Sequence, residues 1–450
     1  MNDTKTFEQQ LASGLDQLAG PRRPVDALAI SRDVIATSPQ WRFQSMFSAT
    51  KFVVSGVVVA LLGGFLVSGV LTEPTTGPAA PGDSTLVVAQ DGSGDFTTIS
   101  EAIETAEDGA TVLVRPGTYT EAIVIDKDIT LTGDGEREAV IIALSDGVTP
   151  VVTIADSEAV LSNLTLTGEK SQVLISGGTP TLEGLLFDGV GIPYAAPPGQ
   201  SFAVSLWLTD GTRARVTGNT FVDGGEISVR GGSAPLIDDN ELSGGPHVYV
   251  PQFGDGMVIR GNTVSGALVN GILVGMKGSL LIEGNTIIDA DSHGIRAIGN
   301  EVIRDNTISG SATGISVESG APKIEGNVLT DNETGMMVAF GTRPTIEGNE
   351  LIDNRLGIGL VGSDALVVRN TITSGEAGIV VTTGGSPTLD SNTVRGASIR
   401  GIAVGGGTSP TLTGNAICDN ATNLFVDGNA APVIDETNEI CEDVVAEPSE

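Results

Sequence analysis

Aromatic and cationic side chains gather in one stretch of the chain, residues 187–260, although aromatic residues make up only 4% of the sequence. An irregular segment, IPYAAPPGQ (192–200), lies inside this stretch. Aromatic faces stack on sugar rings, and an Arg guanidinium pairs with a carboxylate through two parallel hydrogen bonds. The residue types therefore predict a site that binds sugar polymers. The candidate ligand-binding residues are Tyr194, Trp207, Arg230, His247, Tyr249 and Gln252.

A structural role competes with binding for some of these aromatic side chains. For Phe187, Phe202 and Phe221 we favour a place in the hydrophobic core, because Phe carries no polar group. For the Tyr and Trp residues and for Arg230 the two interpretations are equally weighted, since Tyr and Trp also carry a polar group.

Catalytic and metal-binding residues are harder to find. The chain has only two His and two Cys, and no Cys/His cluster has zinc spacing, so we predict no metal site and no cofactor. Acidic groups leave Ca²⁺ open as a ligand. Glycosidases need clustered carboxylates, but for pairs such as Asp238 and Asp239 a solvated surface is the favoured interpretation.

The charge distribution excludes nucleic acid as a partner. The net charge is −33, and residues 72–450 carry 17 Lys/Arg against 51 Asp/Glu. Such an acidic segment repels nucleic acid and anionic lipid. Solubility is the favoured explanation of this charge, ahead of binding to divalent cations or cationic partners.

An uncharged segment at 52–71, FVVSGVVVALLGGFLVSGVL, has the length of a membrane-spanning helix. Arg42 and Lys51 precede it, and the next basic residue is Arg115, so the positive-inside rule places the N-terminus in the cytoplasm. A cleaved signal peptide is the alternative, but 51 residues precede the segment. We predict a cytoplasmic segment (1–51), a transmembrane helix (52–71), an extracytoplasmic linker (72–84) and a single-pass cell-membrane protein.

An Asn recurs at intervals of 21–23 residues from Asn219 to Asn438, each time followed by short strands with alternating apolar residues. A unit this small buries its apolar face only by stacking on its neighbours. The repeat therefore predicts a parallel β-helix of about 22-residue coils over 85–443, with a C-terminal tail at 444–450. We expect the repeated Asn to adopt left-handed backbone angles at a corner and to form a hydrogen-bonded ladder.

The two Cys occupy equivalent places in adjacent coils. Cys418 follows Asn415 by three residues, and Cys441 follows Asn438 by three. Their Cα atoms should then lie about 5 Å apart, within the range that a disulfide requires. We predict a Cys418–Cys441 disulfide, with two stacked free thiols as the alternative.

A short capping helix is predicted before the repeats, beginning at Thr98-x-x-Glu101 and ending at Gly109. The segments DGSGDFTTISEAI (91–103) and VRPGTYTEAIVIDKDITLTGDG (114–135) resemble the start of pectin methylesterases and of pectin lyase-like β-helix proteins. The later coils resemble parallel β-helix repeats of NosD-like proteins. The resemblance implies an all-β fold: a right-handed parallel β-helix with an N-terminal capping helix, here joined to one transmembrane helix.

The same resemblance does not carry an activity with it. Methylesterases use paired Asp residues together with Gln and Arg. Gln200 lies nearest to their first Gln motif, but no Gln follows Phe221, where Asp223 or Glu226 would have to substitute. No catalytic residue is therefore transferred. We expect a membrane-anchored protein that binds cell-surface or cell-wall polysaccharide without catalysis. The alternatives are a carbohydrate-active enzyme (esterase, lyase or glycosidase) and a structural adhesin or spacer.

Overall fold

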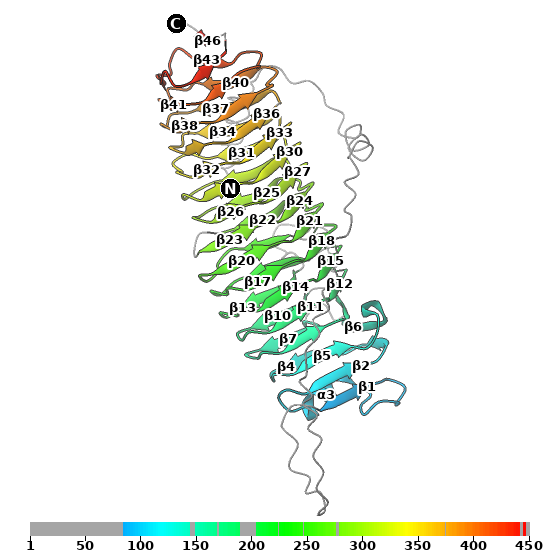
Figure 1. The fold of residues 1–450 in the computed structure, drawn as a ribbon. Coiled ribbons are helices and arrows are strands. Elements are labelled where there is room, and N and C mark those ends of the chain that lie inside the picture. The colour runs from blue at the N-terminus through cyan, green and yellow to red at the C-terminus, as the bar shows by residue number, and fades with distance from the viewer. Residues whose placement is uncertain are drawn as a thin grey trace, which may run out of the picture. The chain divides into compact units, whose positions relative to one another are not determined.

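The computed structural model describes residues 84–144, 149–168, 171–189, 204–223, 225–245, 247–275, 279–373, 375–441 and 444–446. These residues form three long parallel sheets, of 16, 15 and 15 strands, wound into a solenoid (Figure 1). Each coil contributes one strand to sheet A, then one to sheet B, then one to sheet C. The predicted parallel β-helix is confirmed.

The strands are short, as the repeat predicts. Sheet A contains β1 (Thr85–Val88), β2 (Thr111–Val114), β5 (Thr130–Gly133), β8 (Val160–Ser162), β11 (Thr181–Glu183), β14 (Arg215–Thr217), β17 (Leu236–Asp238), β20 (Met257–Arg260), β23 (Leu280–Glu283), β26 (Val302–Arg304), β29 (Lys323–Glu325), β32 (Thr345–Glu347), β35 (Leu366–Val368), β38 (Thr388–Asp390), β41 (Thr411–Thr413) and β44 (Val433–Ile434). Sheet B contains β3 (Gly117–Tyr119), β6 (Val140–Leu144), β9 (Thr165–Gly168), β12 (Leu186–Asp188), β15 (Thr220–Val222), β18 (Glu241–Ser243), β21 (Thr263–Ser265), β24 (Thr286–Ile288), β27 (Thr307–Ser309), β30 (Val328–Thr330), β33 (Glu350–Ile352), β36 (Thr371–Thr373), β39 (Thr393–Arg395), β42 (Ala416–Ile417) and β45 (Glu439–Ile440). Sheet C contains β4 (Ile123–Ile125), β7 (Val152–Ala155), β10 (Ser171–Ser176), β13 (Val204–Thr209), β16 (Glu226–Val229), β19 (Val248–Val250), β22 (Asn270–Val274), β25 (His293–Ala297), β28 (Thr313–Val317), β31 (Thr334–Val338), β34 (Leu356–Val361), β37 (Ala377–Thr382), β40 (Arg400–Val404), β43 (Leu424–Val426) and β46 (Val444–Ala446).

The capping helix α3 (Ile99–Thr105) packs at the first coils, and a single 3-10 turn, η1 (Arg137–Ala139), precedes β6. The Thr98 side chain accepts a hydrogen bond from the Glu101 amide, so the predicted N-cap is confirmed. The helix ends at Thr105, before the predicted Gly109. The backbone becomes extended at the C-cap residue Ala106 (φ −61°, ψ 140°), and the Lys127 ammonium group donates to the carbonyl groups of Ile103, Glu104 and Ala106 at this end.

The core follows the strand alternation. Apolar side chains that point inward from the three sheets form one continuous buried cluster along the solenoid. Phe187 of β12 and Phe221 of β15 lie in it, 1% exposed, with ring centroids 4.2 Å apart. The core prediction is confirmed for these two residues, and Phe202 lies outside the described residues.

The recurring Asn residues form the predicted ladder. From Asn219 to Asn438, the Nδ2 of each Asn donates to the side-chain Oδ1 of the next Asn at 2.8–3.0 Å. The expectation of a left-handed backbone at the Asn was wrong. The residue before it makes the corner, as at Asp239 (φ 54°) and Gly261 (φ 64°), so the Asn side chain can point inward.

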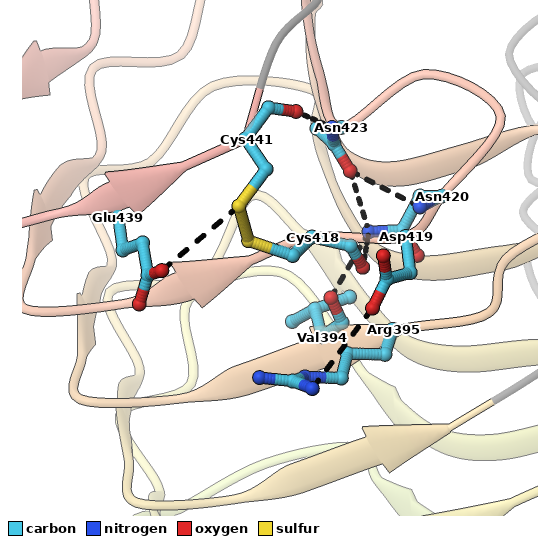
Figure 2. The surroundings of a disulfide bond; sticks show 8 residues. All are labelled: Val394, Arg395, Cys418, Asp419, Asn420, Asn423, Glu439 and Cys441. Carbon is cyan, nitrogen blue, oxygen red and sulfur yellow. Dashed lines mark hydrogen bonds and ion pairs between the residues drawn. A yellow bond between two sulfur atoms is a disulfide. The ribbon is translucent and has the colours of Figure 1, made fainter.

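The last coil is closed by the Cys418–Cys441 disulfide, whose Cα atoms are 5.0 Å apart (Figure 2). Cys418 directly follows β42, Cys441 directly follows β45, and these two strands pair in sheet B. The Asn423 side chain donates to the Cys441 carbonyl and holds the same turn. Repeat register alone therefore placed these two sulfur atoms in bonding distance.

Several predicted segments lie outside the described residues: the cytoplasmic segment 1–51, the transmembrane helix 52–71 and nearly all of the linker 72–84. Within the described ranges, no helix has the length and apolar character needed to cross a membrane. At the other end, β46 pairs with β43 as far as Ala446, so the solenoid continues beyond the predicted boundary at 443.

Candidate functional site

The outer face of sheet C carries the aromatic residues that the sequence singled out. On β13, Leu206 and Leu208 point into the core, so Trp207 between them points outward. The strand register places Trp207 beside Ser228 of β16, and Ser228 beside Tyr249 of β19. Three successive coils therefore present Trp207, Ser228 and Tyr249 in one line.

Arg230 completes this group from the end of β16. Its guanidinium carbon lies 4.7 Å from the Trp207 ring centroid and 5.7 Å from that of Tyr249. Its Nε donates to Ser228 Oγ at 3.1 Å. Among the described residues, no carboxylate lies within ion-pair distance of this guanidinium. The structure thus holds a cation between two aromatic rings with hydrogen-bond donors left for another group.

An open depression of about 570 Å³ adjoins this clamp of Trp207, Arg230 and Tyr249. Its lining comes from successive sheet C strands and the turns that follow them: Tyr249, Pro251, Gln252, Leu273, Val274, Gly275, Arg296 and Ile298. Two predicted binding residues, Tyr249 and Gln252, therefore meet at one concave surface. Aliphatic side chains form much of the wall, as in most ligand sites.

The far side of the depression has a charged pair that sequence reasoning missed. Arg296 of β25 donates to Glu318 through Nε at 2.6 Å and Nη2 at 2.7 Å. The geometry is that of a bidentate pair, which fixes the guanidinium plane. The available signal was HGIRA (293–297), where an Arg stands in the strand position that holds Ser, Met or Gly in the next coils.

His247 does not join the aromatic clamp. Its Nε2 lies 3.5 Å from Glu226 Oε2, where β16 and β19 begin, two residues before Ser228 and Tyr249. Glu226 is only 4% exposed, and its second oxygen has no hydrogen-bond partner among the described residues. The pair therefore lies next to the clamp. Tyr194, the remaining predicted ligand residue, lies outside the described residues.

The second histidine, His293 of β25, is neutral at pH 7. Burial, helped by the positive charge of Arg296, lowers its pKa to about 4. Its Nδ1 lies 2.9 Å from both Asn270 Oδ1 and Ser292 Oγ. These contacts give His293 a structural role at the start of the strand.

The favoured interpretation of Asp238 as a solvated residue was wrong. It is 1% exposed and lies between Arg215 Nη2 at 3.2 Å and Arg260 Nη2 at 3.5 Å, on the outer face of sheet A. The two Arg side chains lie over the Asp238 carboxylate and shield it from water. Asp239 instead forms the corner with φ 54°.

Metal-binding side chains do not converge at the outer face of sheet C in the described part of the chain. The one group of three potential ligands found there is Cys418, Glu439 and Cys441, near the C-terminal end. Both sulfur atoms of that group are already bonded to each other (Figure 2). A thiolate site is therefore ruled out at that place.

Family models match most of the solenoid. The model "Right handed beta helix region" matches residues 200–321 and 270–417, and the model "Pectinesterase" matches residues 85–164. The chain is a right-handed β-helix protein of the pectin lyase-like type. The pectinesterase match in this β-helix protein covers the capping helix and the first coils. It ends before β13, where the aromatic clamp begins.

The curated relatives align only to the N-terminal part. Probable pectinesterase 56 of Arabidopsis thaliana is 37% identical over 75 residues, covering 15% of this chain and 26% of that protein. Probable pectinesterase/pectinesterase inhibitor 13 from the same plant is 39% identical over 61 residues, covering 12% of this chain and 10% of that protein. The β-helix chain thus spans about a quarter or less of these relatives. Among solved structures, the catalytic unit of an α-1,3-glucanase from Streptomyces thermodiastaticus is similar at 13% identity and TM-score 0.45, over 77% of this chain and 66% of that one.

Proposed function

We propose that the solenoid is a polysaccharide-binding module and that sheet C is its binding face. The observation that carries the proposal is the clamp of Trp207, Arg230 and Tyr249 beside an open depression. Aromatic rings on a flat sheet offer stacking surfaces to sugars. Tyr and Trp have only two side-chain torsion angles, so they lose little conformational entropy on binding. The pectinesterase family match supports a carbohydrate partner of this kind.

Arg230 selects for an acidic sugar in this proposal. Its Nε is engaged by Ser228, and its terminal amino groups are free of described carboxylates. A uronate carboxylate can pair with them in a bidentate manner. The surrounding domain is acidic, so the local cation is what permits an anionic polymer to approach.

Display at a cell membrane is the second part of the proposal. The uncharged segment 52–71 is the anchor, the N-terminus is cytoplasmic and the solenoid is outside. The Cys418–Cys441 disulfide supports this placement, since disulfides persist in oxidising compartments. Neither a cofactor nor Ca²⁺ is required for binding in this proposal.

A carbohydrate-active enzyme is the second candidate, and one observation favours it. Glu226 is buried, has one oxygen without a partner among the described residues, and lies 3.5 Å from His247, where the strands next to Arg230 and Tyr249 begin. A carboxyl and an imidazole in contact can act as general acid and base. The test must therefore score turnover as well as retention.

The experiment uses the full-length protein in detergent on a panel of immobilised glycans, with and without Ca²⁺. We expect retention on a polyuronate without released product. Trp207→Ala and Tyr249→Ala should each weaken binding about tenfold, which corresponds to about 1.4 kcal/mol. Leu366→Ala, a half-exposed apolar position on sheet A, is the matched control and should bind as wild type.

Other outcomes select the other candidates. Product release that Glu226→Gln abolishes would establish an enzyme. Absence of both binding and product would leave a structural adhesin or spacer. A strict need for Ca²⁺ would contradict the metal-independent mode proposed here.

A further inference from the structure

Phe340 is the most exposed large apolar side chain among the described residues, at 69%. It lies in the turn between β31 and β32, where sheet C passes to sheet A. Its ring is held against the next coil: a Cβ added to Gly362 would lie 2.0 Å from Phe340 Cδ2 and 2.7 Å from Cε2. The Cδ2–Cε2 edge of the ring therefore lies against the Gly362 backbone, and most of the side chain is open to solvent.

The turn is shaped to receive this ring. Gly362 has φ +61°, which a larger residue adopts only with strain, and it leaves the space that the ring fills. One coil further, Thr383 occupies the equivalent turn position with φ 66°. Phe340 is thus a fixed, flat aromatic surface, in contrast to a loose hydrophobic side chain.

Strand register places Phe340 on the edge that carries the depression. Val250 of β19 and Val338 of β31 occupy the same register position in sheet C, connected through the strand pairs of β22, β25 and β28. Gln252 and Phe340 each come two residues after these paired Val residues, so they hold the same turn position four coils apart. At about 4.8 Å per coil, the separation is about 19 Å, and Trp207 lies about 29 Å from Phe340 along the axis.

We infer that Phe340 is a second stacking platform, so that one polysaccharide chain lies along the solenoid from Trp207 to Phe340. The inference rests on the proposed function and adds the length of ligand that the site requires. A short fragment fills the clamp and the depression only. A long fragment also covers the ring of Phe340, and its second contact is intramolecular, so affinity rises with chain length.

The test compares polyuronate fragments of two size classes on the full-length protein. One class covers two or three coils, and the other spans the whole distance from Trp207 to Phe340. We expect Phe340→Ala to reduce affinity for long fragments about three- to tenfold and to leave short fragments unchanged. Phe340→Trp should retain the binding of long fragments, and Leu366→Ala serves as the exposed apolar control on sheet A.

The two hypotheses fail in different ways. Equal affinity of wild type for short and long fragments, with no effect of Phe340→Ala on either, would overturn the platform and leave the binding face intact. An equal loss for both size classes in Phe340→Ala would also overturn it, since the ring would then act through folding. If no fragment of either size binds, the proposed function fails, and the platform fails with it.

Discussion

At the residue scale, side-chain type predicted which residues bind a ligand, but their contacts in the structure determine their roles. Trp207 and Tyr249 could equally have been core residues, and the outward parity of their strands placed them on the surface. His247 was nominated with them and instead pairs with the buried Glu226. The pairing of His247 has no local signal in the sequence, since it depends on a residue one coil away.

Glu301 provides a test of burial at this scale. It is 2% exposed, one oxygen lacks a partner among the described residues, and the other accepts the Gly299 amide at 3.3 Å. Burial raises its pKa above the usual value of 4.5, so the folded state holds the proton more tightly than the unfolded chain. Stability is then lost as pH rises above the unfolded pKa.

We expect Glu301→Gln to stabilise the protein at pH 8 by about 1 kcal/mol and to leave stability at pH 4 nearly unchanged. Denaturant unfolding at both pH values measures the difference. Glu350→Gln, at an exposed position of β33, is the control and should show no such pH dependence. A stabilisation of the same size at pH 4 would argue against burial of the charge as the cause.

At the element scale, the Asn ladder and the strand corners act together. A left-handed residue turns the chain, and the Asn that follows it points inward and bonds to the next coil. Asn327 donates to Asn349 Oδ1, Ile303 O and Glu325 O, and accepts from the amide and side chain of Asn306. The ladder thereby satisfies backbone groups that the corner removes from the sheets.

Asn327→Ala should therefore destabilise the fold by about 3 kcal/mol or more, because it leaves buried donors and acceptors unpaired on both neighbouring coils. Asn300→Ala removes an exposed Asn outside the ladder that, within the described ranges, accepts one hydrogen bond, from the Ala321 amide, and it should cost less than about 1 kcal/mol. Thermal unfolding of both variants tests the difference. Similar losses would mean that the ladder contributes no more than an ordinary turn.

At the scale of the whole molecule, each described strand of the solenoid pairs with strands of the adjacent coils, with α3 at one end and the disulfide near the other. In such repeat architectures a perturbation at one end is expected to stay there. The last strands are short, and Val433 and Ile434 of β44 are 61% and 41% exposed. The disulfide is thus the main cross-link that holds this coil.

Replacing both Cys418 and Cys441 by Ala should loosen the last coil alone. We expect amide exchange to accelerate at least tenfold over 424–441 and to stay unchanged over 323–373, because each coil depends on its immediate neighbours. Hydrogen-exchange mass spectrometry resolves both segments. Uniform acceleration along the chain would show instead that the disulfide supports the solenoid as a single cooperative unit.

The sequence by itself determined the architecture, because strand alternation, together with an Asn every 21–23 residues from Asn219 to Asn438, leaves few ways to bury the apolar side chains. The same period placed Cys418 over Cys441. It placed the left-handed corner one residue too late, since Gly, Asp, Arg and Ser all serve there and only the Asn is regular. The tertiary structure alone decided the site. Three contacts join residues about one or more coils apart: the aromatic clamp around Arg230, the Arg296–Glu318 pair and the ring of Phe340 against Gly362. Which side chains meet depends on the strand register and on the shape of each turn.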